Sequence, residues 1–288
     1  MTVRFSRTSH AETQRTFAKP SIVTGYGHEA GQSVTDAIGI DHISFTGSAR
    51  VGTIIAQSAA KRHIPVTLEL GGKRPQIAFA DANLDKAIPV IVNAIIQNAG
   101  HTCSAGPRLL VEASVYERVL EAVGQRIKAL NVGPAAMDLD VGPLIRANQL
   151  ERVNGFLREA EKANLRTIAQ GSIAAEAPAT GFYAKLSQDE VVGPVLAAMS
   201  FKDEADAVRL AIAAEYGLVA GIWTENGGRA MRMARAVKSG QGFINNYGAG
   251  GGVELPFGGE KSSGYGREKS FEALYGFSAM KTVVVKHG

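Results

Sequence analysis

Two side chains in this sequence have the chemistry that covalent catalysis needs. Cys103 is the only cysteine among the 288 residues, and it lies in a run of small residues. A thiolate is a strong nucleophile, although a single cysteine is more often a small buried hydrophobic residue. Glu69 interrupts the apolar stretch 65–70. Because burial of a lone carboxylate is costly, two interpretations stay open: a core Glu paired with Lys73 or Arg74, or a general base whose pKa is raised by apolar surroundings.

The expected local structure places Cys103 where a ligand can reach it. Apolar residues at helical spacing predict a helix from residue 84 to near Gly100, since glycine suits a left-handed helix end. A β-rich run follows at residues 108–112. Cys103 therefore lies in a loop between a helix and a strand, and such a loop can expose a thiol.

Two glycine-containing turns have the context of a phosphate site. Gly25, Gly27 and Gly31 follow a predicted strand and open a helical stretch, where backbone N–H groups can face an anion. Their spacing differs from the common dinucleotide fingerprint. The turn with Gly47 and Ser48 also lies between a strand and a helix. Ser48 is equally compatible with a simple N-cap and with a pyrophosphate contact.

The elements that position these residues alternate between strands and helices along the chain, a pattern typical of α/β proteins. Strands are predicted at residues 21–24, 40–45, 65–70, 76–80, 108–112, 194–201, 219–224 and 242–245. Helices are predicted through residues 34–38, 51–59, 84–95, 115–130, 147–164, 204–214 and 228–239. We expect two domains that each contain a largely parallel sheet.

Composition limits the classes of partner. The chain is 45% hydrophobic and 20% charged with a net charge of +4, which is ordinary for a soluble globular protein. No basic run marks a nucleic-acid groove, and no apolar stretch approaches the roughly 20 residues that span a bilayer. The polar first twenty residues lack the apolar core of a secretory signal. A single cysteine excludes an intrachain disulfide and favours a reducing, cytoplasmic setting.

Several motifs occur in a fixed order from residue 21 to the end. They are Phe45-Thr46-Gly47-Ser48, Leu68-Glu69-Leu70-Gly71-Gly72-Lys73, Gly100-x-x-Cys103-Ser104-Ala105, Glu190-Val191-Val192-Gly193-Pro194-Val195, Tyr216-Gly217-Leu218, Trp223-Thr224 and Pro256-Phe257-Gly258-Gly259-x-Lys261-x-Ser263-Gly264-x-Gly266-Arg267-Glu268. Together they resemble the aldehyde dehydrogenase superfamily. The resemblance implies a partial Rossmann-like nucleotide-binding domain followed by an α/β catalytic domain.

The resemblance also implies roles for individual residues. Cys103 matches the nucleophile that forms a thiohemiacetal and then a thioester, and Glu69 matches the base that activates the hydrolytic water. Glu268 matches a carboxylate in proton relay with that base, although a solvated or ion-paired surface Glu is as compatible. Phe257 matches a residue near the substrate. The implied hydride acceptor is NAD or NADP, and the residues expected to bind it are Gly25, Gly47, Ser48, Val51, Leu70, Gly71 and Glu190.

The sequence departs from the family pattern at several points. His101 replaces a Gln, and two interpretations stay open: an ion pair with the thiolate, or an outward-facing neutral substitute. Val192 stands where the family prefers Phe, and the stretch before Glu190 is shortened, which weakens the expectation for Glu190. The family's long N-terminal region, with a Trp-Asn motif that completes the oxyanion hole, has no counterpart here.

We therefore expect an N-terminally truncated, NAD(P)-dependent aldehyde dehydrogenase that acts on a small-molecule aldehyde and binds neither nucleic acid nor membrane. The expected parts are a partial nucleotide-binding domain (1–72), a catalytic domain (73–265) and a C-terminal tail (266–288). The β-branched run 280–286 could form an edge strand in a homo-oligomer, a dimer or tetramer. Two alternatives are a catalytically weak remnant that serves as a binding or oligomerisation module, and a cofactor-independent thiol esterase.

Overall fold

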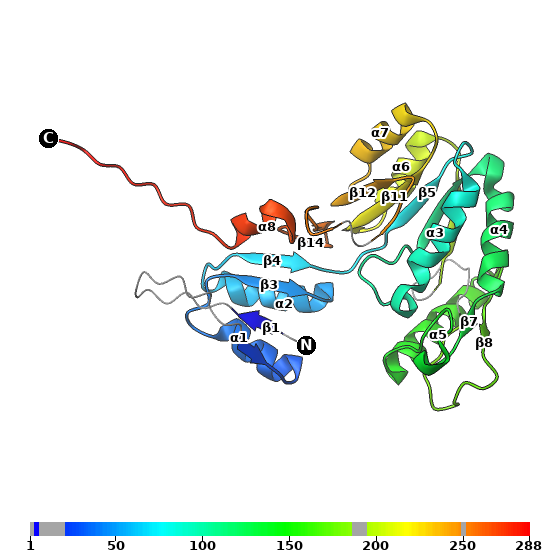
Figure 1. The fold of residues 1–288 in the computed structure, drawn as a ribbon, viewed down its shortest axis with the longest axis horizontal. Helices are drawn as coiled ribbons and strands as arrows, with labels where there is room; N and C mark the ends of the chain where they lie inside the picture. Colours follow the sequence, from blue (N-terminus) through cyan, green and yellow to red (C-terminus); the bar gives the residue numbers. More distant parts are fainter. Residues whose placement is uncertain (1–2, 6–20, 186–194, 249–251) are drawn as a thin grey trace.

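The computed structural model describes residues 3–5, 21–185, 195–248 and 252–288. Figure 1 shows two lobes: a larger one built on a five-stranded sheet and a smaller one built on a three-stranded sheet. The C-terminal tail leads away from both lobes. The predicted α/β class is confirmed.

The larger sheet is wholly parallel, with the strand order β12-β11-β5-β6-β9. Its strands are β5 (Pro75–Ala78), β6 (Arg108–Glu112), β9 (Ala197–Phe201), β11 (Val219–Trp223) and β12 (Gln241–Ile244). Every residue of β5 and β11 is buried, as expected for parallel strands that are covered on both faces.

Helices cover both faces of this sheet. They are α3 (Leu84–Ile96), α4 (Tyr116–Lys128), α6 (Glu204–Ile212) and α7 (Gly227–Ala236). Successive residues of a strand point to opposite faces. In β6, Leu109 and Val111 belong to the core formed with α3 and α4, whereas Leu110 belongs to the core formed with α6 and α7. The lobe thus has three layers.

The smaller sheet contains β3 (Ile43–Thr46), β4 (Val66–Glu69) and β14 (Gly264–Tyr265). β3 and β4 are parallel and joined by α2 (Ala49–Ala60), whereas β14 pairs antiparallel with β4. Gly264 lies opposite Glu69 and has a φ of +110°. A Cβ at Gly264 would lie 1.9 Å from the carbonyl oxygen of Leu68, so this pairing requires glycine.

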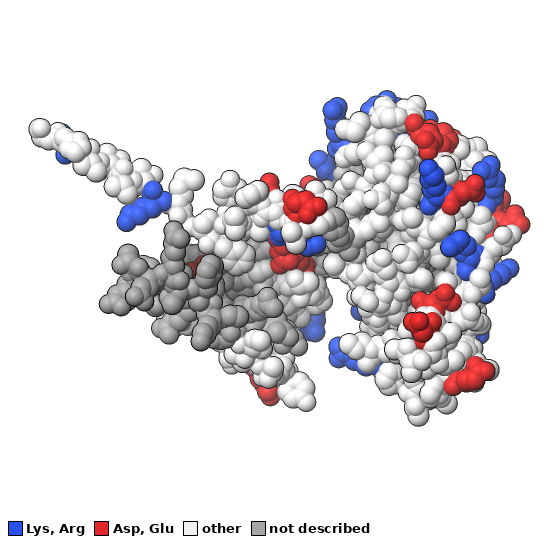
Figure 2. Space-filling model, in the orientation of Figure 1, with Lys and Arg blue, Asp and Glu red and all other residues white. Residues whose placement is uncertain are grey.

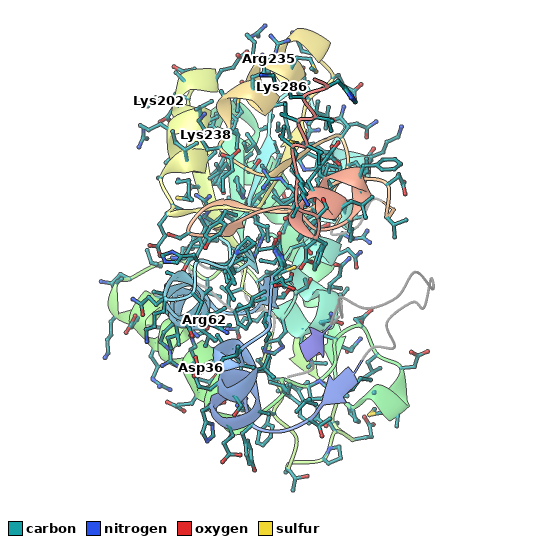
Figure 3. The ribbon with its side chains drawn as sticks, turned by 90° about the vertical axis from the view of Figure 1, so that its left-hand side faces the viewer. Asp36, Arg62, Lys202, Arg235, Lys238 and Lys286 are labelled. Carbon is teal, nitrogen blue, oxygen red and sulfur yellow. The ribbon has the colours of Figure 1, made fainter. Side chains whose placement is uncertain are left out.

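A short helix, α1 (Gln32–Asp36), packs beside α2. The Asp36 carboxylate accepts a hydrogen bond of 2.6 Å from Ser58, and the Arg62 guanidinium donates to the carbonyl oxygen of Thr35. Figure 3 shows Asp36 and Arg62 in this lobe, far from the basic residues labelled on the larger one. These contacts join α1 to the helix that follows β3.

The remaining elements are short or peripheral. They are β1 (Val3–Phe5), β2 (Ser21–Val23), a π-helical turn (Gly27–Gly31), 3₁₀ turns (Gln97–Gly100, Ala113–Val115, Ala135–Met137), β7 (Asn131–Val132), α5 (Ala147–Lys162), β8 (Ser172–Ile173), β10 (Tyr216–Gly217), β13 (Glu260–Lys261) and α8 (Ser270–Gly276). β10 pairs with β13, which attaches the C-terminal region to the larger lobe.

One expected element differs from the structure, and another stays a prediction. The helix predicted through Ile38 ends at Asp36, and Ile38 is 98% exposed, because no core lies beside that last turn. The edge strand predicted for residues 280–286 in a homo-oligomer stays a prediction, and in the single chain these residues form no strand. The run extends from α8 into solvent without a neighbouring backbone, and a strand requires such a neighbour for its hydrogen bonds (Figure 1).

The surface view shows lysine and arginine interspersed with aspartate and glutamate over the larger lobe (Figure 2). On the described part of the chain, no helix is both long and apolar enough to cross a membrane. Over the same residues, no group of three or more His, Cys, Asp or Glu side chains is arranged to hold a metal ion.

Candidate active site

The loop that carries Cys103 begins with an unusual helix end. Asn98 and Ala99 have φ values of 50° and 52°, and Gly100 has a φ of 76°. This left-handed run stops the helical region that follows α3 and turns the chain toward β6. The α-helix thus ends at Ile96, before the predicted end near Gly100, whereas Gly100 has the left-handed conformation that was predicted. Cys103 is half-buried in the loop that follows.

Two side chains from distant parts of the sequence bind the carbonyl groups of this loop. The Tyr247 hydroxyl donates to the carbonyl oxygen of Ser104 at 2.8 Å. The Arg74 guanidinium donates through Nη1 to the carbonyl oxygen of Ala105 at 3.1 Å. Arg74 precedes β5 and Tyr247 follows β12, so the ends of two strands support one loop.

The surroundings of Cys103 are apolar and aromatic. Phe257, Leu218 and Val219 form a buried cluster, and Cys103 packs against it together with Tyr247. The Lys269 ammonium lies 5.4 Å from the centre of the Phe257 ring and so has the distance of a cation–π contact. The sequence placed Phe257 near the substrate, and the structure places it beside the thiol.

Phe257 is also joined to Glu268. The two residues exchange two backbone hydrogen bonds, both of 2.7 Å. The Glu268 side chain is half-buried and accepts a hydrogen bond of 2.7 Å from the Ser44 hydroxyl on β3. Glu268 is therefore fixed between the aromatic cluster and the smaller sheet, and it is not a freely solvated surface carboxylate.

Glu69 ends β4 and is only 2% exposed. Its carboxylate oxygens have no hydrogen-bond partner among the described residues. The pKa of Glu69 is raised to about 8, chiefly by burial and also by the Glu268 charge, while Arg267 opposes the shift. An acid with this pKa is divided between its two protonation states near neutral pH, which suits a general base.

The alternative of a core Glu paired with Lys73 or Arg74 is wrong. Arg74 donates to the carbonyl oxygen of Ala105, and no ion pair in the described parts of the chain includes Glu69. The reason is geometric: the chain leaves the smaller sheet after Glu69, and Arg74 already belongs to the larger lobe.

Ser263 connects the Glu69 region to the C-terminal region. Its hydroxyl donates to the carbonyl oxygen of Gly71 at 2.8 Å and accepts from the N–H of Gly217 at 3.0 Å. Its carbonyl oxygen accepts the N–H of Leu70 at 3.0 Å. Ser263 is fully buried. The backbone of Leu70 and Gly71, expected to face a cofactor, is thus partly committed to a structural contact.

The turn before α2 keeps the features of an anion site. The Ser48 hydroxyl accepts the N–H of Val51 at 3.3 Å, so Ser48 is the N-cap of a twelve-residue helix with no acidic residue in its first turn. Gly47 is exposed and donates its N–H to the carbonyl oxygen of Glu69. A Cβ at Gly47 would lie 2.4 Å from the Phe45 ring. Glycine therefore relieves crowding in this turn, and the first N–H groups of α2 have no partner within the helix.

Of the two other residues expected to bind the cofactor, Gly25 and Glu190, the structure describes only Gly25. Gly25 is exposed and precedes the π-helical turn, so its region lies apart from β3 and β4 in the sheet pairing. Glu190 lies outside the described residues, and so does Val192.

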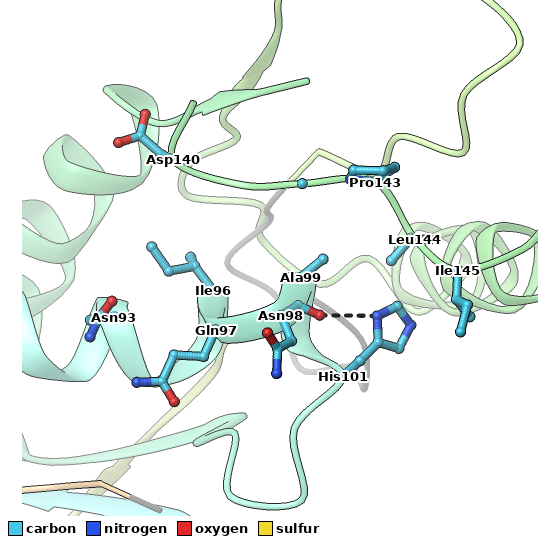
Figure 4. Close-up of a pocket in the computed structure, with 11 residues that line it drawn as sticks. Asn93, Ile96, Gln97, Asn98, Ala99, His101, Asp140, Pro143, Leu144 and Ile145 are labelled. Atoms are coloured by element: carbon cyan, nitrogen blue, oxygen red, sulfur yellow. Dashed lines mark hydrogen bonds between the residues drawn. The ribbon is translucent and has the colours of Figure 1, made fainter. Parts of the chain in front are cut away.

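His101 lies on the surface of the Cys103 loop. It is exposed, and its Nδ1 lies 3.1 Å from the carbonyl oxygen of Asn98. Figure 4 shows it on the wall of an open pocket of about 820 Å³, opposite Leu144 and Ile145. The outward-facing interpretation is the one that agrees with this geometry.

Sequence reasoning assigned no role to Tyr247, Ser263 and Arg267, and it named Arg74 only as a possible partner of Glu69. Arg74 and Tyr247 bind the Cys103 loop, Ser263 fastens the Glu69 strand, and Arg267 acts on the charge of Glu69. Ser263 and Arg267 belong to the quoted C-terminal motif, which was the one available signal for them. Arg74 and Tyr247 had no signal beyond their polarity.

Comparisons with known proteins show the family of this chain. The aldehyde dehydrogenase family profile matches residues 20–283. An aldehyde dehydrogenase from Emericella nidulans is 36% identical over 93% of this chain and 56% of its own length. A solved aldehyde dehydrogenase homologue from Burkholderia cenocepacia has a TM-score of 0.90 at 56% identity, covering 92% of this chain and 58% of that one.

The structure of a Bacillus cereus aldehyde dehydrogenase in complex with NAD+ has a TM-score of 0.84 at 33% identity, over 90% of this chain and 55% of that protein. The chain thus spans about half the length of the relatives it matches. The family match covers most of the chain, and the solved relatives share its fold. The chain belongs to the aldehyde dehydrogenase family.

Proposed function

We propose that this chain oxidises an aldehyde to a carboxylic acid with NAD or NADP, with Cys103 as nucleophile and Glu69 as base. One observation supports this most. A buried carboxyl group with a pKa of about 8 is coupled to Glu268, whose backbone is bonded to Phe257, and Phe257 packs against the only cysteine. These relationships place the candidate base and the candidate nucleophile on either side of one C-terminal segment.

In the proposed reaction the Cys103 thiolate attacks the carbonyl carbon of the aldehyde and forms a thiohemiacetal. The backbone N–H of Cys103 is a candidate donor to the developing oxyanion. Phe257 and the neighbouring apolar side chains restrict the access of water to the thiol. Removal of hydride from the former carbonyl carbon leaves a thioester on Cys103.

Glu69 completes the cycle in this proposal. Its carboxylate accepts a proton from a water molecule, and the resulting hydroxide equivalent attacks the thioester, releasing the acid and restoring the thiol. Glu268 and the Ser44 hydroxyl extend from Glu69 toward solvent-accessible β3. They offer a path by which the proton leaves Glu69.

The turn at α2 fits a cofactor pyrophosphate, because its helix has free N–H groups, a glycine at which an added Cβ would crowd the Phe45 ring, and no acid in its first turn. Ser48 and Val51 would lie at this end, with Leu70 and Gly71 nearer the reacting carbon and Glu190 on the ribose. When bound, the nicotinamide accepts the hydride. The NAD+ complexes of related aldehyde dehydrogenases support this assignment.

Several features of the whole protein belong to the same proposal. We assign residues 1–72 to cofactor binding, 73–265 to catalysis and 266–288 to assembly in a homo-oligomer. Exposed apolar side chains on α8 and the tail support the last assignment, among them Phe271, Leu274, Tyr275, Phe277 and Met280. A cytoplasmic location is part of the proposal.

The test is the absorbance of reduced cofactor in the presence of a panel of aldehydes with NAD or NADP. The wild-type chain should reduce one of the cofactors, and Cys103→Ala should not. If wild type and Cys103→Ala are equally inactive with every aldehyde, the proposal is wrong for this chain. Ester hydrolysis that requires Cys103 but no cofactor would then favour the thiol esterase.

A further inference from the structure

A lysine lies beside the aromatic residue of the thiol cluster. The Lys269 ammonium is 5.4 Å from the centre of the Phe257 ring. Phe257 is only 8% exposed and belongs to the buried cluster against which Cys103 packs. One buried ring thus contacts a cation and belongs to the cluster that holds the thiol.

The charge of Lys269 is not neutralised by the protein. No ion pair among the described residues includes Lys269. Its neighbour Glu268 accepts a hydrogen bond from Ser44 on β3 instead. The exposed Glu254 carboxylate lies against the backbone of Gly252. Because the Lys269 side chain is itself exposed, a ligand that enters from solvent can reach its ammonium.

Arg267 is a second cation on the same segment. Its Nη1 donates to the carbonyl oxygens of Gly259 at 3.1 Å and Gly266 at 2.7 Å. A Cβ on Gly258 would lie 2.9 Å from this nitrogen, so the guanidinium lies against the residue that follows Phe257. In the described parts of the chain, Arg267 also belongs to no ion pair. Two cations without an acidic partner therefore border Phe257 and Gly258.

The backbone holds Lys269 in a conformation that a lysine rarely adopts. Its φ is +61° and that of Ser270 is +57°, in the left-handed region that favours glycine. On one side, Glu268 exchanges two backbone hydrogen bonds with Phe257. On the other side, Ser270 donates its N–H to the carbonyl oxygen of Val253 at 2.7 Å. The base of the Lys269 side chain is therefore fixed beside the Phe257 segment.

We propose that Lys269 is a specificity-determining residue, and that the aldehyde this chain prefers carries a carboxylate. The inference rests on the proposed oxidation of an aldehyde at Cys103. The carboxylate binds at the Lys269 end of Phe257 while the aldehyde carbon meets the thiol, so the substrate class is that of ω-oxo carboxylic acids. A fixed cation raises the encounter rate and the affinity of an anionic ligand. A neutral aldehyde gains nothing from it.

Turnover of two aldehydes of equal chain length, succinic semialdehyde and butanal, tests the preference. Wild type should have the higher kcat/KM with the anion. Lys269→Met keeps the apolar contact with Phe257 but loses the charge. Its kcat/KM should fall by about fivefold for succinic semialdehyde and by less than about twofold for butanal. Lys269→Arg should keep the preference. Arg267 stays unchanged, because it also acts on the charge of Glu69.

Alkylation of Cys103 makes the same comparison without aldehyde or cofactor. Iodoacetate is an anion and iodoacetamide is neutral, and both lose iodide to the same thiolate. The ratio of their rates therefore does not depend on how far the thiol is ionised. The chain has one cysteine, so intact mass reports this site alone. The ratio of iodoacetate to iodoacetamide should fall by about threefold in Lys269→Met, and high salt should reduce the difference.

Lys202→Met is the matched control and should leave both ratios unchanged. Lys202 is an exposed lysine that follows the carboxyl end of β9, whereas Cys103 precedes the amino end of the neighbouring strand β6 (Figure 3). Thermal melting shows whether each variant folds, and Lys269→Gln removes the same charge if Lys269→Met does not fold. A folded, uncharged variant with the wild-type preference for anions overturns the inference. A chain in which Lys269 sets the alkylation ratio but which oxidises no aldehyde would support the anion site and contradict the proposed function.

Discussion

Phe257 and Glu268 exchange two backbone hydrogen bonds of 2.7 Å. Their side chains act on different residues. Phe257 belongs to the cluster that holds Cys103, whereas the Glu268 charge raises the pKa of Glu69. The C-terminal segment therefore connects a group of the larger lobe with a group of the smaller one. Any movement of this segment changes the surroundings of both.

Glu268→Gln should shift the pH dependence of turnover. Glu69 is proposed to act when ionised, so the wild-type rate should rise as pH increases through about 8. Removal of the like charge at residue 268 lowers the pKa of Glu69, and the midpoint should fall by about one pH unit. Burial, the larger cause, remains. The measurement is the rate of cofactor reduction at saturating aldehyde from pH 6 to pH 10, and an identical midpoint in both proteins would contradict the coupling.

Glu69→Gln should increase stability at alkaline pH. The pKa of Glu69 is about 8 in the folded protein, against 4.5 for an ordinary glutamate. Between these values the folded chain holds a proton that the unfolded chain has released, so the contribution to stability is full below 4.5 and is lost as pH rises through 8. Gln stays neutral throughout.

Urea denaturation should therefore show the variant more stable than wild type at pH 9, by on the order of 4 kcal/mol, since one pKa unit corresponds to about 1.4 kcal/mol. At pH 4.5 the two proteins should be similar. Equal stability at both pH values would mean that the Glu69 carboxylate is better solvated or paired than its burial indicates.

Gly264→Ala should disrupt the pairing of β14 with β4. The φ of +110° disfavours alanine, and its Cβ would lie 1.9 Å from the Leu68 carbonyl oxygen, which is backbone and cannot move aside. We expect a loss of about 3 kcal/mol or more in unfolding free energy. Gly242→Ala is the control, because no atom lies within 4 Å of the added Cβ. Similar losses in both variants would contradict the predicted crowding at Gly264.

Arg108→Met should destabilise the larger lobe. The Arg108 guanidinium donates twice to the carbonyl oxygen of Lys73, at 2.9 and 2.7 Å, and to those of Leu210 at 2.9 Å and Ala211 at 2.8 Å. Its loss leaves the C-terminal carbonyls of α6 without these donors, and we expect about 3 kcal/mol of destabilisation in urea. An exposed arginine such as Arg235 should change the same quantity by less than about 0.5 kcal/mol. No difference between the two would show that water replaces Arg108.

The sequence was informative where structure depends on local pattern. The strand 108–112 occurs as predicted, because a β-rich run involves neighbours in the chain. The helix through Ile38 was wrong, since local spacing does not show that no core lies beside its last turn.

The support of the site depends on contacts that no local pattern contains. β14 pairs with β4 across about 195 residues of sequence, as in Gly264 opposite Glu69. Tyr247 reaches the loop of Cys103 from the end of β12. Such contacts follow from the packing of two lobes, and a single sequence indicates them only where a family motif includes the residue. Ser263 lies in such a motif, whereas Arg74 lies just outside one.

The most direct measurement is the intact mass of Glu69→Gln after incubation with an oxidisable aldehyde and the cofactor. If Cys103 and Glu69 act in turn on one substrate, the variant should form one equivalent of reduced cofactor and stop as an acyl thioester on Cys103. Cys103→Ala should show neither. A Glu69→Gln chain that turns over like wild type, or that reduces cofactor with no acyl group on Cys103, would contradict the shared site.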